Sequence, residues 1–180
     1  MNNLGFKKLT IDNWLEPDTF MKIFAQLDSN GNVDEISKEE WLQDILEIQL
    51  TDTVPEEIIK LFEVSKNTMS YGYFFYPIYT LASEQLYRVV ESAVTHKCKI
   101  MKASNKDMKT FKLKIKFLME NSVLSKSEEL RWEGIRGLRN SASHPETQSI
   151  ILPTMALGAL ERTANIINSI FKDIPVSHSR

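Results

Sequence analysis

One short stretch near residue 140 carries the side chains best suited to chemistry. It contains Arg139, Asn140 and His144, and Pro145 follows the histidine directly. Arginine is a permanent cation whose planar fork of donors can hold a phosphate by two oxygens. Histidine can take or give a proton near neutral pH. Together with the Asn140 amide, these groups are the minimum needed to cleave a phosphodiester without a metal.

The spacing of these residues limits how they can meet within one chain. Five positions along an ideal helix turn a side chain by about 140°, so Arg139 and His144 would not share a helical face. Because His144 precedes a proline, it is pushed out of the α region, and the helix should end near it. We therefore expect Arg139 on the last helical turn and His144 at its exit. Two copies facing each other across a dimer axis could build a tighter site.

The stretch resembles a known family motif. Arg-Asn-x-x-x-His followed by proline, at the end of a leucine-containing helix, is similar to the ribonuclease motif of the HEPN superfamily of small helical domains. A second stretch, from Tyr71 to Arg88, resembles the long first core helix that such domains place before the motif. The resemblance spans residues 55–172, and only the six-residue motif is chemically specific.

This resemblance implies an all-α, HEPN-like antiparallel helical bundle with extra N-terminal helices. It also implies a metal-independent endoribonuclease without cofactors, a toxin or antiviral-defence effector, whose RNA products end in 2′,3′-cyclic phosphate. A homodimer with a composite site and a cognate antitoxin or regulatory protein are expected as partners. His144 would carry the proton, Arg139 would stabilise the phosphorane charge and Asn140 would position phosphate or imidazole. Glu84 would orient Arg139 or His144, as an acidic residue on this helix does in some relatives.

The same residues also have less specific interpretations. Cations stabilise helix C-termini, so Arg139 and His144 could simply cap carbonyl groups. Glu84, Arg88 and Glu91 lie three and four residues apart and could form only a salt bridge along one helix. The chain could then be a non-catalytic HEPN-like binding or dimerisation module, or a regulatory subunit.

Local signals predict the helices that would position the motif. Capping boxes predict three helix starts, at Ser37, Thr53 and Ser125. Apolar residues at helical spacing predict helices over 74–96 and 154–172. Asp18 could cap a further short helix near the N-terminus. Residues 28–39 mimic a calcium loop, but Val33 stands where the loop needs glycine, so we predict a polar turn.

A lysine-rich stripe precedes the motif. Residues 97–116 contain eight lysines and one acidic residue, a composition that can neutralise phosphates. We expect Lys112, Lys116 and Arg136 to bind RNA, although a solvated lysine-rich face is an equal alternative. Residues 111–117 alternate strictly between apolar and lysine positions, which is typical of a strand, but no partner strand is visible and a helix is preferred.

Two glycines lie inside the predicted motif helix. Gly134 and Gly137 should each cost about 1 kcal/mol relative to alanine in a helix. We therefore predict that they permit close packing of another helix, which could come from the same chain or from a second copy.

Composition places the chain among soluble globular proteins. It has 180 residues, of which 42% are hydrophobic and 26% charged. It has no run of eighteen apolar residues, no apolar signal core and a single cysteine, Cys98, so we expect a cytoplasmic protein away from membranes. Neither a glycine-rich phosphate loop nor a zinc-type Cys/His cluster is present in the sequence.

The net charge of −2 is unevenly distributed along the chain. Residues 1–66 carry a net charge of −8 and residues 67–180 one of +6. This asymmetry suggests an acidic region beside a basic domain or a face for a polyanion, although solvated helices can also drift in charge. We predict an acidic N-terminal helical region (1–54) packed on a HEPN-like helical core (55–175), with a short tail (176–180).

Overall fold

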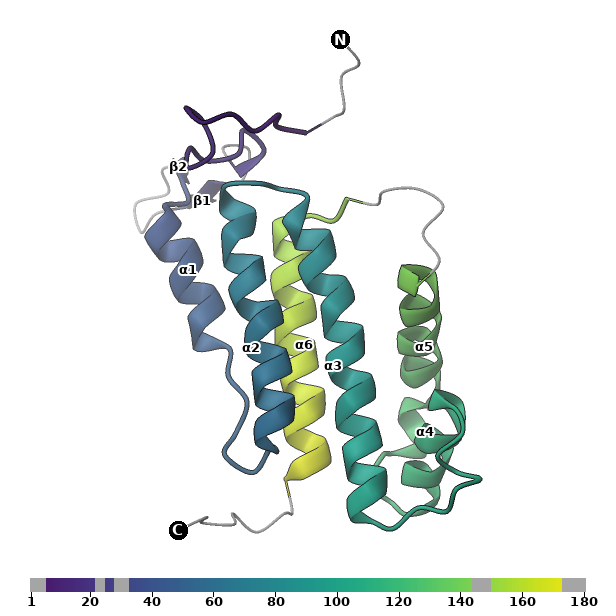
Figure 1. The fold of residues 1–180 in the computed structure, drawn as a ribbon. Helices are drawn as coiled ribbons and strands as arrows, with labels where there is room; N and C mark the ends of the chain where they lie inside the picture. Colours follow the sequence, from purple (N-terminus) through teal and green to yellow (C-terminus); the bar gives the residue numbers. More distant parts are fainter. Residues whose placement is uncertain (1–5, 22–24, 28–32, 144–149, 173–180) are drawn as a thin grey trace.

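The computed structural model describes residues 6–21, 25–27, 33–143 and 150–172 and confirms an all-α fold (Figure 1). The helices are α1 (Lys38–Glu47), α2 (Glu56–Ser70), α3 (Ile78–Ile100), α4 (Phe111–Glu120), α5 (Glu129–Ser143) and α6 (Pro153–Phe171). Two short 3-10 helices are η2 (Tyr71–Tyr73) and η3 (Lys126–Glu128). None of the described helices is both long and apolar enough to cross a membrane.

The core forms where α2, α3 and α6 pack side by side (Figure 1). Phe62 of α2, Leu86 of α3 and Ile167 of α6 are fully buried there. Burying each such side chain contributes about 1.5–3 kcal/mol. The Ser65 hydroxyl donates a 2.6 Å hydrogen bond to the carbonyl of Ala82, which satisfies a buried polar group inside the α2–α3 contact.

The two predicted capping boxes near the N-terminus have different outcomes. At α1, Ser37 Oγ accepts from the Glu40 N–H at 3.2 Å and the Glu40 carboxylate accepts from the Ser37 N–H at 2.9 Å, as expected. The box at Thr53 is wrong, because α2 begins after Pro55 without a side-chain cap. The Thr53 hydroxyl instead shares a 2.8 Å hydrogen bond with Thr51. Pro55 has no backbone N–H, but the first N–H groups of any helix lack an acceptor within the helix. No helical hydrogen bond is therefore lost at this position.

The short helix expected after Asp18 is only partly covered by the described residues: Met21 has 3-10 conformation, residues 22–24 lie outside them, and a small hairpin follows. The buried Asp18 carboxylate accepts from the N–H of Tyr76 at 2.9 Å and of Phe20 at 3.1 Å. The Asp18 N–H donates to the Tyr73 carbonyl at 2.8 Å. The bond from Phe20 is a local capping contact, and the bonds with Tyr73 and Tyr76 fix the N-terminal segment to the α2–α3 connection.

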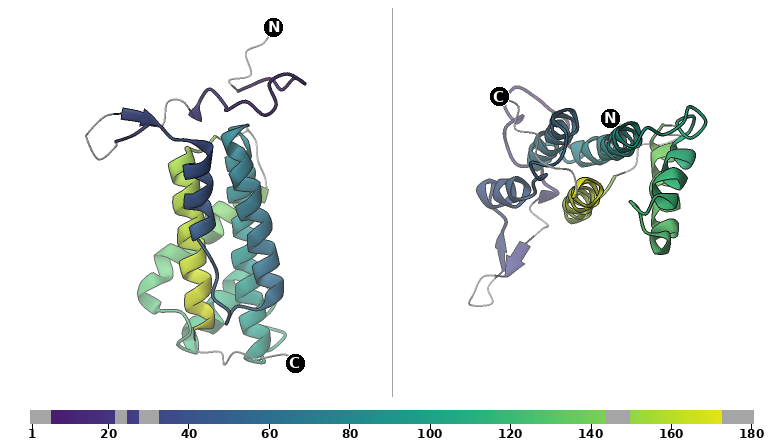
Figure 2. Two further views of the ribbon diagram at one scale, coloured as in Figure 1. Left: turned by 90° about the vertical axis from the view of Figure 1, so that its left-hand side faces the viewer. Right: turned by 90° about the horizontal axis from the view of Figure 1, so that it is seen from below.

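Two three-residue strands follow this turn. Strand β1 (Ala25–Leu27) pairs antiparallel with β2 (Val33–Glu35), and Figure 2 shows this hairpin projecting away from the helices. The end of the calcium-loop mimic therefore forms β2 and the approach to α1. Its first five residues, 28–32, lie outside the described residues.

The helices predicted from periodicity are found. The alternating segment 111–117 lies in α4, whose first turn is capped by Thr110 Oγ1 accepting from the Leu113 N–H at 3.2 Å. Helix α6 agrees with the prediction of 154–172. Helix α3 starts at Ile78, later than predicted, because Tyr71–Tyr73 forms η2 and Pro77 occupies the N-cap.

Helix α5, which carries Arg139 and Asn140 of the motif, stands beside α3 and above α4 in Figure 1. Ser125 Oγ accepts from the Ser127 N–H at 3.2 Å and so begins η3, which leads into α5. Trp132 is buried and anchors α5. The helix continues to Ser143, so Arg139 lies just over one turn before its end.

Candidate functional site between α3 and α5

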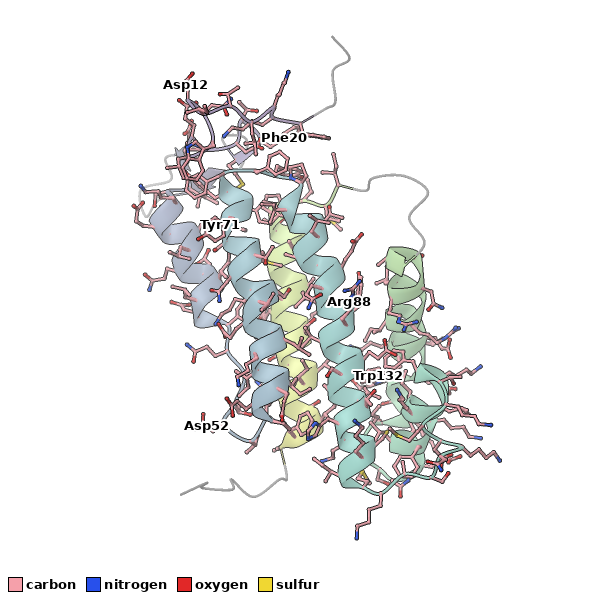
Figure 3. All side chains as sticks on the ribbon, in the orientation of Figure 1. Asp12, Phe20, Asp52, Tyr71, Arg88 and Trp132 are labelled. Atoms are coloured by element: carbon pink, nitrogen blue, oxygen red, sulfur yellow. The ribbon has the colours of Figure 1, made fainter. Side chains whose placement is uncertain are left out.

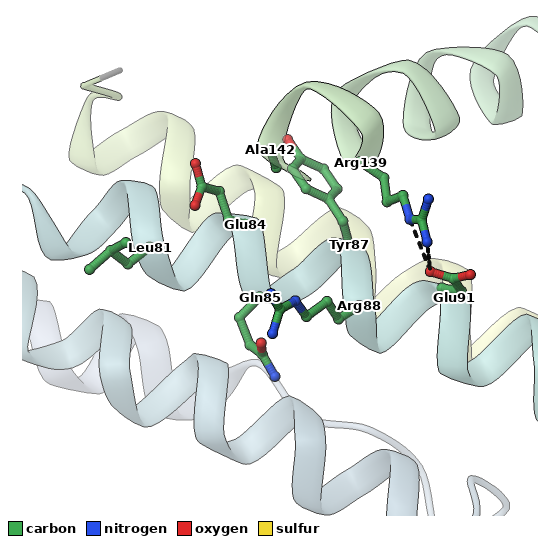
Figure 4. A pocket seen from close by; sticks show the side chains of 8 residues that line it. All are labelled: Leu81, Glu84, Gln85, Tyr87, Arg88, Glu91, Arg139 and Ala142. Carbon is green, nitrogen blue, oxygen red and sulfur yellow. Dashed lines mark hydrogen bonds and ion pairs between the residues drawn. The ribbon is translucent and has the colours of Figure 1, made fainter. Parts of the chain in front are cut away.

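A cavity of about 450 Å³ lies between α3 and α5 (Figure 4). Its lining comes mainly from one face of α3, with two residues added by α5. The lining residues are Leu81, Glu84, Gln85, Tyr87, Arg88, Glu91, Arg139 and Ala142.

Helix α3 presents different chemistry to its two sides. Glu84, Arg88 and Glu91 are spaced by four and three residues, which places them on one helical face. The neighbouring Val89 and Val90 belong to the buried core. Core packing of the apolar face therefore directs the charged face of α3 toward α5.

The guanidinium of Arg139 is held from two directions. Its Nε donates to Oε2 of Glu91 at 3.0 Å, its Nη2 forms an ion pair with the same oxygen at 2.8 Å, and its Nη1 donates to Oδ1 of Asn140 at 3.2 Å. The side chains of Arg139 and Glu91 are 36% and 26% exposed. An ion pair this accessible contributes no more than about 1 kcal/mol. The guanidinium is therefore oriented, yet a competing anion could displace Glu91.

Tyr87 adds a neutral donor to the cavity. Burial raises the pKa of its phenol, and the nearby charge of Glu84 raises this pKa further, while Arg162 partly opposes the shift. Since the ordinary pKa of tyrosine is already near 10, the phenol keeps its proton at neutral pH. Tyr87 can therefore donate a hydrogen bond but cannot act as a general base there.

Part of the predicted catalytic set meets at this cavity. Arg139 and Glu84 both line it, and Asn140 bonds to Arg139 from the exposed side of α5. The carboxylate bonded to Arg139 is Glu91, two turns beyond Glu84 along α3. His144 lies outside the described residues.

The predicted RNA-binding residues lie elsewhere. Lys112 and Lys116 are exposed on α4. Arg136 donates from Nε and Nη2 to one oxygen of Glu133, at 2.8 and 2.6 Å, within α5. None of the three lines the cavity.

Sequence reasoning missed the roles of Glu91 and Tyr87. The available signal was the run of polar residues on one face of an otherwise apolar helix. From that signal, Glu91 was expected only in a salt bridge along α3. Within the described part of the chain, the ion pair at this face instead joins α3 to α5. The described residues also contain no group of three or more His, Cys, Asp or Glu side chains placed to hold a metal ion.

Comparison with known proteins adds no relative. No family model matches the chain, and neither a curated protein nor a solved structure matches it.

Proposed function

We propose that the chain is a metal-independent endoribonuclease of HEPN type, with the cavity between α3 and α5 as its phosphodiester site. The observation that carries this proposal is the position of Arg139. The motif arginine lines a polar cavity to which α3 adds a second arginine, Arg88, whose guanidinium lies beside Gln85 in Figure 4. Two arginines lining one cavity suit a phosphate group, which arginine can hold through paired hydrogen bonds.

Binding would begin with an exchange of anions on Arg139. A non-bridging phosphate oxygen replaces the Glu91 carboxylate, which frees Nε and Nη2 of the guanidinium for the substrate. Asn140 keeps Nη1 in place during this exchange. The Tyr87 phenol, protonated at neutral pH, supplies a further donor from α3. Because these donors are already positioned, they can stabilise the charge that grows on phosphorus in the transition state.

The proposed reaction is an internal transfer. The ribose 2′-oxygen attacks the adjacent phosphorus as a base removes its proton, and the bond from phosphorus to the 5′-oxygen breaks as that oxygen receives a proton. The products are a 2′,3′-cyclic phosphate and a 5′-hydroxyl. On the resemblance of the motif, His144 carries the proton, and Glu84 orients His144 or Arg139.

The test compares cleavage of mixed single-stranded RNA in chelator by the unaltered protein and by His144→Ala and Arg139→Ala. We expect both variants to lose activity, and Arg139→Ala to lower kcat by about 10²–10³-fold, the usual effect of removing one transition-state donor. Arg131→Ala is the matched control, because Arg131 is also an α5 arginine bonded to a carboxylate, that of Glu128, but lies away from the cavity. Cleavage that leaves 3′-hydroxyl ends would contradict the proposed chemistry.

A non-catalytic module is the alternative, and one contact favours it. The Arg139–Glu91 pair joins α5 to α3 and could serve only to hold the two helices together. In that case no RNA is cleaved, and Arg139→Ala lowers the free energy of unfolding without changing any activity. A role as a toxin or defence effector with a neutralising partner protein is proposed from the motif resemblance alone.

A further inference from the structure

The residues by which α3 lines the cavity between α3 and α5 form two adjacent rows along the helix. Within each row the residues are spaced by three or four positions. The first row is Glu84, Tyr87 and Glu91, and the second row is Leu81, Gln85 and Arg88. In Figure 4, Tyr87 of the first row points toward Ala142 of α5, whereas the Arg88 guanidinium of the second row lies beside Gln85. The second row therefore borders a different part of the cavity from the ion pair of Arg139.

The fold makes little use of the side chains in this second row. Within the part of the chain that the structure describes, neither the Gln85 amide nor the Arg88 guanidinium has a hydrogen bond or an ion pair. Arg88 is exposed, Gln85 is partly buried, and Leu81 of the same row is 55% exposed. These side chains can therefore bind a ligand without breaking a bond that stabilises the protein.

The cavity offers more room than a phosphate group requires. Its volume of about 450 Å³ lies within the range of about 300–1,000 Å³ found for pockets that hold small ligands. Gln85 and Arg88 precede Glu91 by six and three residues, which corresponds to about 9 and 4.5 Å along the helix axis. A nucleotide whose phosphate replaces Glu91 on Arg139 would therefore place its base near the second row.

We infer that Leu81, Gln85 and Arg88 bind a guanine base next to the phosphate held by Arg139. The inference rests on the ribonuclease proposal, which supplies RNA as the ligand and assigns the phosphate to Arg139. Guanine presents two adjacent acceptors, O6 and N7, that match the planar fork of an arginine. Next to O6 it carries the N1–H donor, which the amide oxygen of Gln85 can accept. Leu81 supplies apolar contact to the face of the base.

Adenine fits the same pair of side chains less well. It carries an amino donor, N6, at the position where guanine has the acceptor O6. One donor of the Arg88 fork would then face another donor and lose its hydrogen bond, which costs binding free energy. Selectivity between guanine and adenine is therefore the property that tests the inference.

The test measures the binding of guanosine 3′,5′-bisphosphate and adenosine 3′,5′-bisphosphate to the full chain by isothermal titration calorimetry in chelator. Each probe carries a phosphate on both sides of its nucleoside, so the result does not depend on strand direction. We expect the guanosine probe to bind about tenfold more tightly, which lies within the discrimination that a paired arginine–guanine contact provides.

Two substitutions test the residues assigned to the base. Arg88→Gln should remove the preference for guanosine, because an amide pairs with N6 and N7 of adenine instead. The loss of charge weakens both probes alike, so the ratio of their affinities reports the base contact. Gln85→Ala should lower this ratio severalfold. Gln43→Ala is the matched control, because Gln43 lies on α1, bonds to Glu47 at 3.3 Å and does not line the cavity.

Mapping of cut sites in mixed RNA separates this inference from the ribonuclease proposal. We expect cuts next to guanosine in the unaltered protein and no such preference in Arg88→Gln. Cleavage without base preference would overturn the inference and leave the ribonuclease proposal standing. Selective binding of the guanosine probe without RNA cleavage would support the guanine site and contradict the ribonuclease. Equal affinity for the two probes, no binding of either, or a preference retained in Arg88→Gln would overturn the inference.

Discussion

At the scale of single residues, the central feature is Arg139, for which Glu91 and an incoming phosphate would compete. Glu91 and Asn140 together contact all three of its guanidinium nitrogen atoms, through two hydrogen bonds and one ion pair. Such an arrangement orients the guanidinium before substrate arrives, which lowers the entropy lost on binding. In the proposed ribonuclease, the same arrangement would require the substrate to displace the Glu91 carboxylate. Glu91 would then set how readily the cavity accepts an anion.

Replacing Glu91 by glutamine separates these two effects. Glu91→Gln keeps a hydrogen-bond acceptor for Arg139 but removes the competing negative charge, so we expect the KM for RNA to fall severalfold. Steady-state kinetics in chelator provide the measurement. Glu128→Gln is the control, because Glu128 also pairs with an α5 arginine, Arg131, but does not line the cavity. An unchanged or higher KM in Glu91→Gln would show that this carboxylate does not compete with RNA.

At the scale of elements, α3 has two tasks. Its apolar face forms the core with α2 and α6, and its charged face supplies six of the eight cavity-lining residues. The entry into α3 therefore affects both stability and the site. This entry passes through η2, where Gly72 lies against the ring of Tyr79, a fully buried residue of α3.

Gly72 has no room for a side chain. A Cβ at this position would overlap the ring of Tyr79, which is buried and cannot move freely. We expect Gly72→Ala to lower the free energy of unfolding by about 1–3 kcal/mol, as overpacking does, and to lower the Tm in a thermal melt. For comparison, Gly158→Ala in α6 meets only the end of the flexible Arg162 side chain and should be neutral or stabilising. Equal effects from the two substitutions would contradict this account.

At the scale of the whole molecule, positive charge gathers where α3 meets α4. The exposed lysines there form what we name the α3–α4 lysine surface, comprising Lys99, Lys102, Lys106, Lys109, Lys112 and Lys116. In Figure 3, side chains tipped by nitrogen project into solvent around α4. Two lysines of the same stripe have other contacts: Lys97 lies 5.7 Å from the centre of the Phe171 ring, and Lys114 donates to Thr95 at 2.9 Å. Six lysines of the stripe thus face solvent, while Lys97 and Lys114 contact other parts of the protein.

If the α3–α4 lysine surface binds RNA, affinity should depend strongly on salt. For single strands, log K falls with log salt by about 0.7 for each phosphate that the protein neutralises. The double variant Lys112→Gln/Lys116→Gln should therefore give a shallower slope, by about 0.7 for each phosphate that these two lysines neutralise, measured by fluorescence anisotropy. Lys60→Gln, an exposed lysine of α2 paired with Glu56, should leave the slope unchanged. A slope that stays constant in the double variant would assign RNA binding to another surface.

The reactivity of the buried Cys98 thiol can be used to follow unfolding of the protein. Burial raises the pKa of its thiol to about 11, from an ordinary value of 9.0. The folded protein therefore holds the neutral thiol between these values while the unfolded chain ionises, so this group makes stability decrease as pH rises from about 9 to 11. At a pH of about 8, the native thiol should react with a disulfide reagent far more slowly than the urea-unfolded chain. Rapid labelling of the native protein would contradict this burial.

Local chemistry in the sequence determined most helices. The Ser37 capping box, the helical spacing in 154–172 and the helix chosen for 111–117 depend on residues within a few turns of each other, so they could be predicted without the fold. The Thr53 capping box was wrong, because α2 begins at Glu56 and the Thr53 hydroxyl bonds to Thr51. The contact of Asp18 with Tyr76, 58 residues away, could not be predicted from local sequence.

Only the tertiary structure decided which groups meet at the site. Glu84 and Glu91 share one face of α3, and sequence spacing cannot say which of them reaches Arg139. That choice depends on how α5 is offset along α3, since Arg139 and Glu91 are 48 residues apart in the sequence. The contacts of α5 with α3 and α4 and the burial of Trp132 hold α5 in this position. The same packing turns Gly134 and Gly137 outward. Short-range periodicity thus specified the faces of each helix, while long-range packing specified what each face meets.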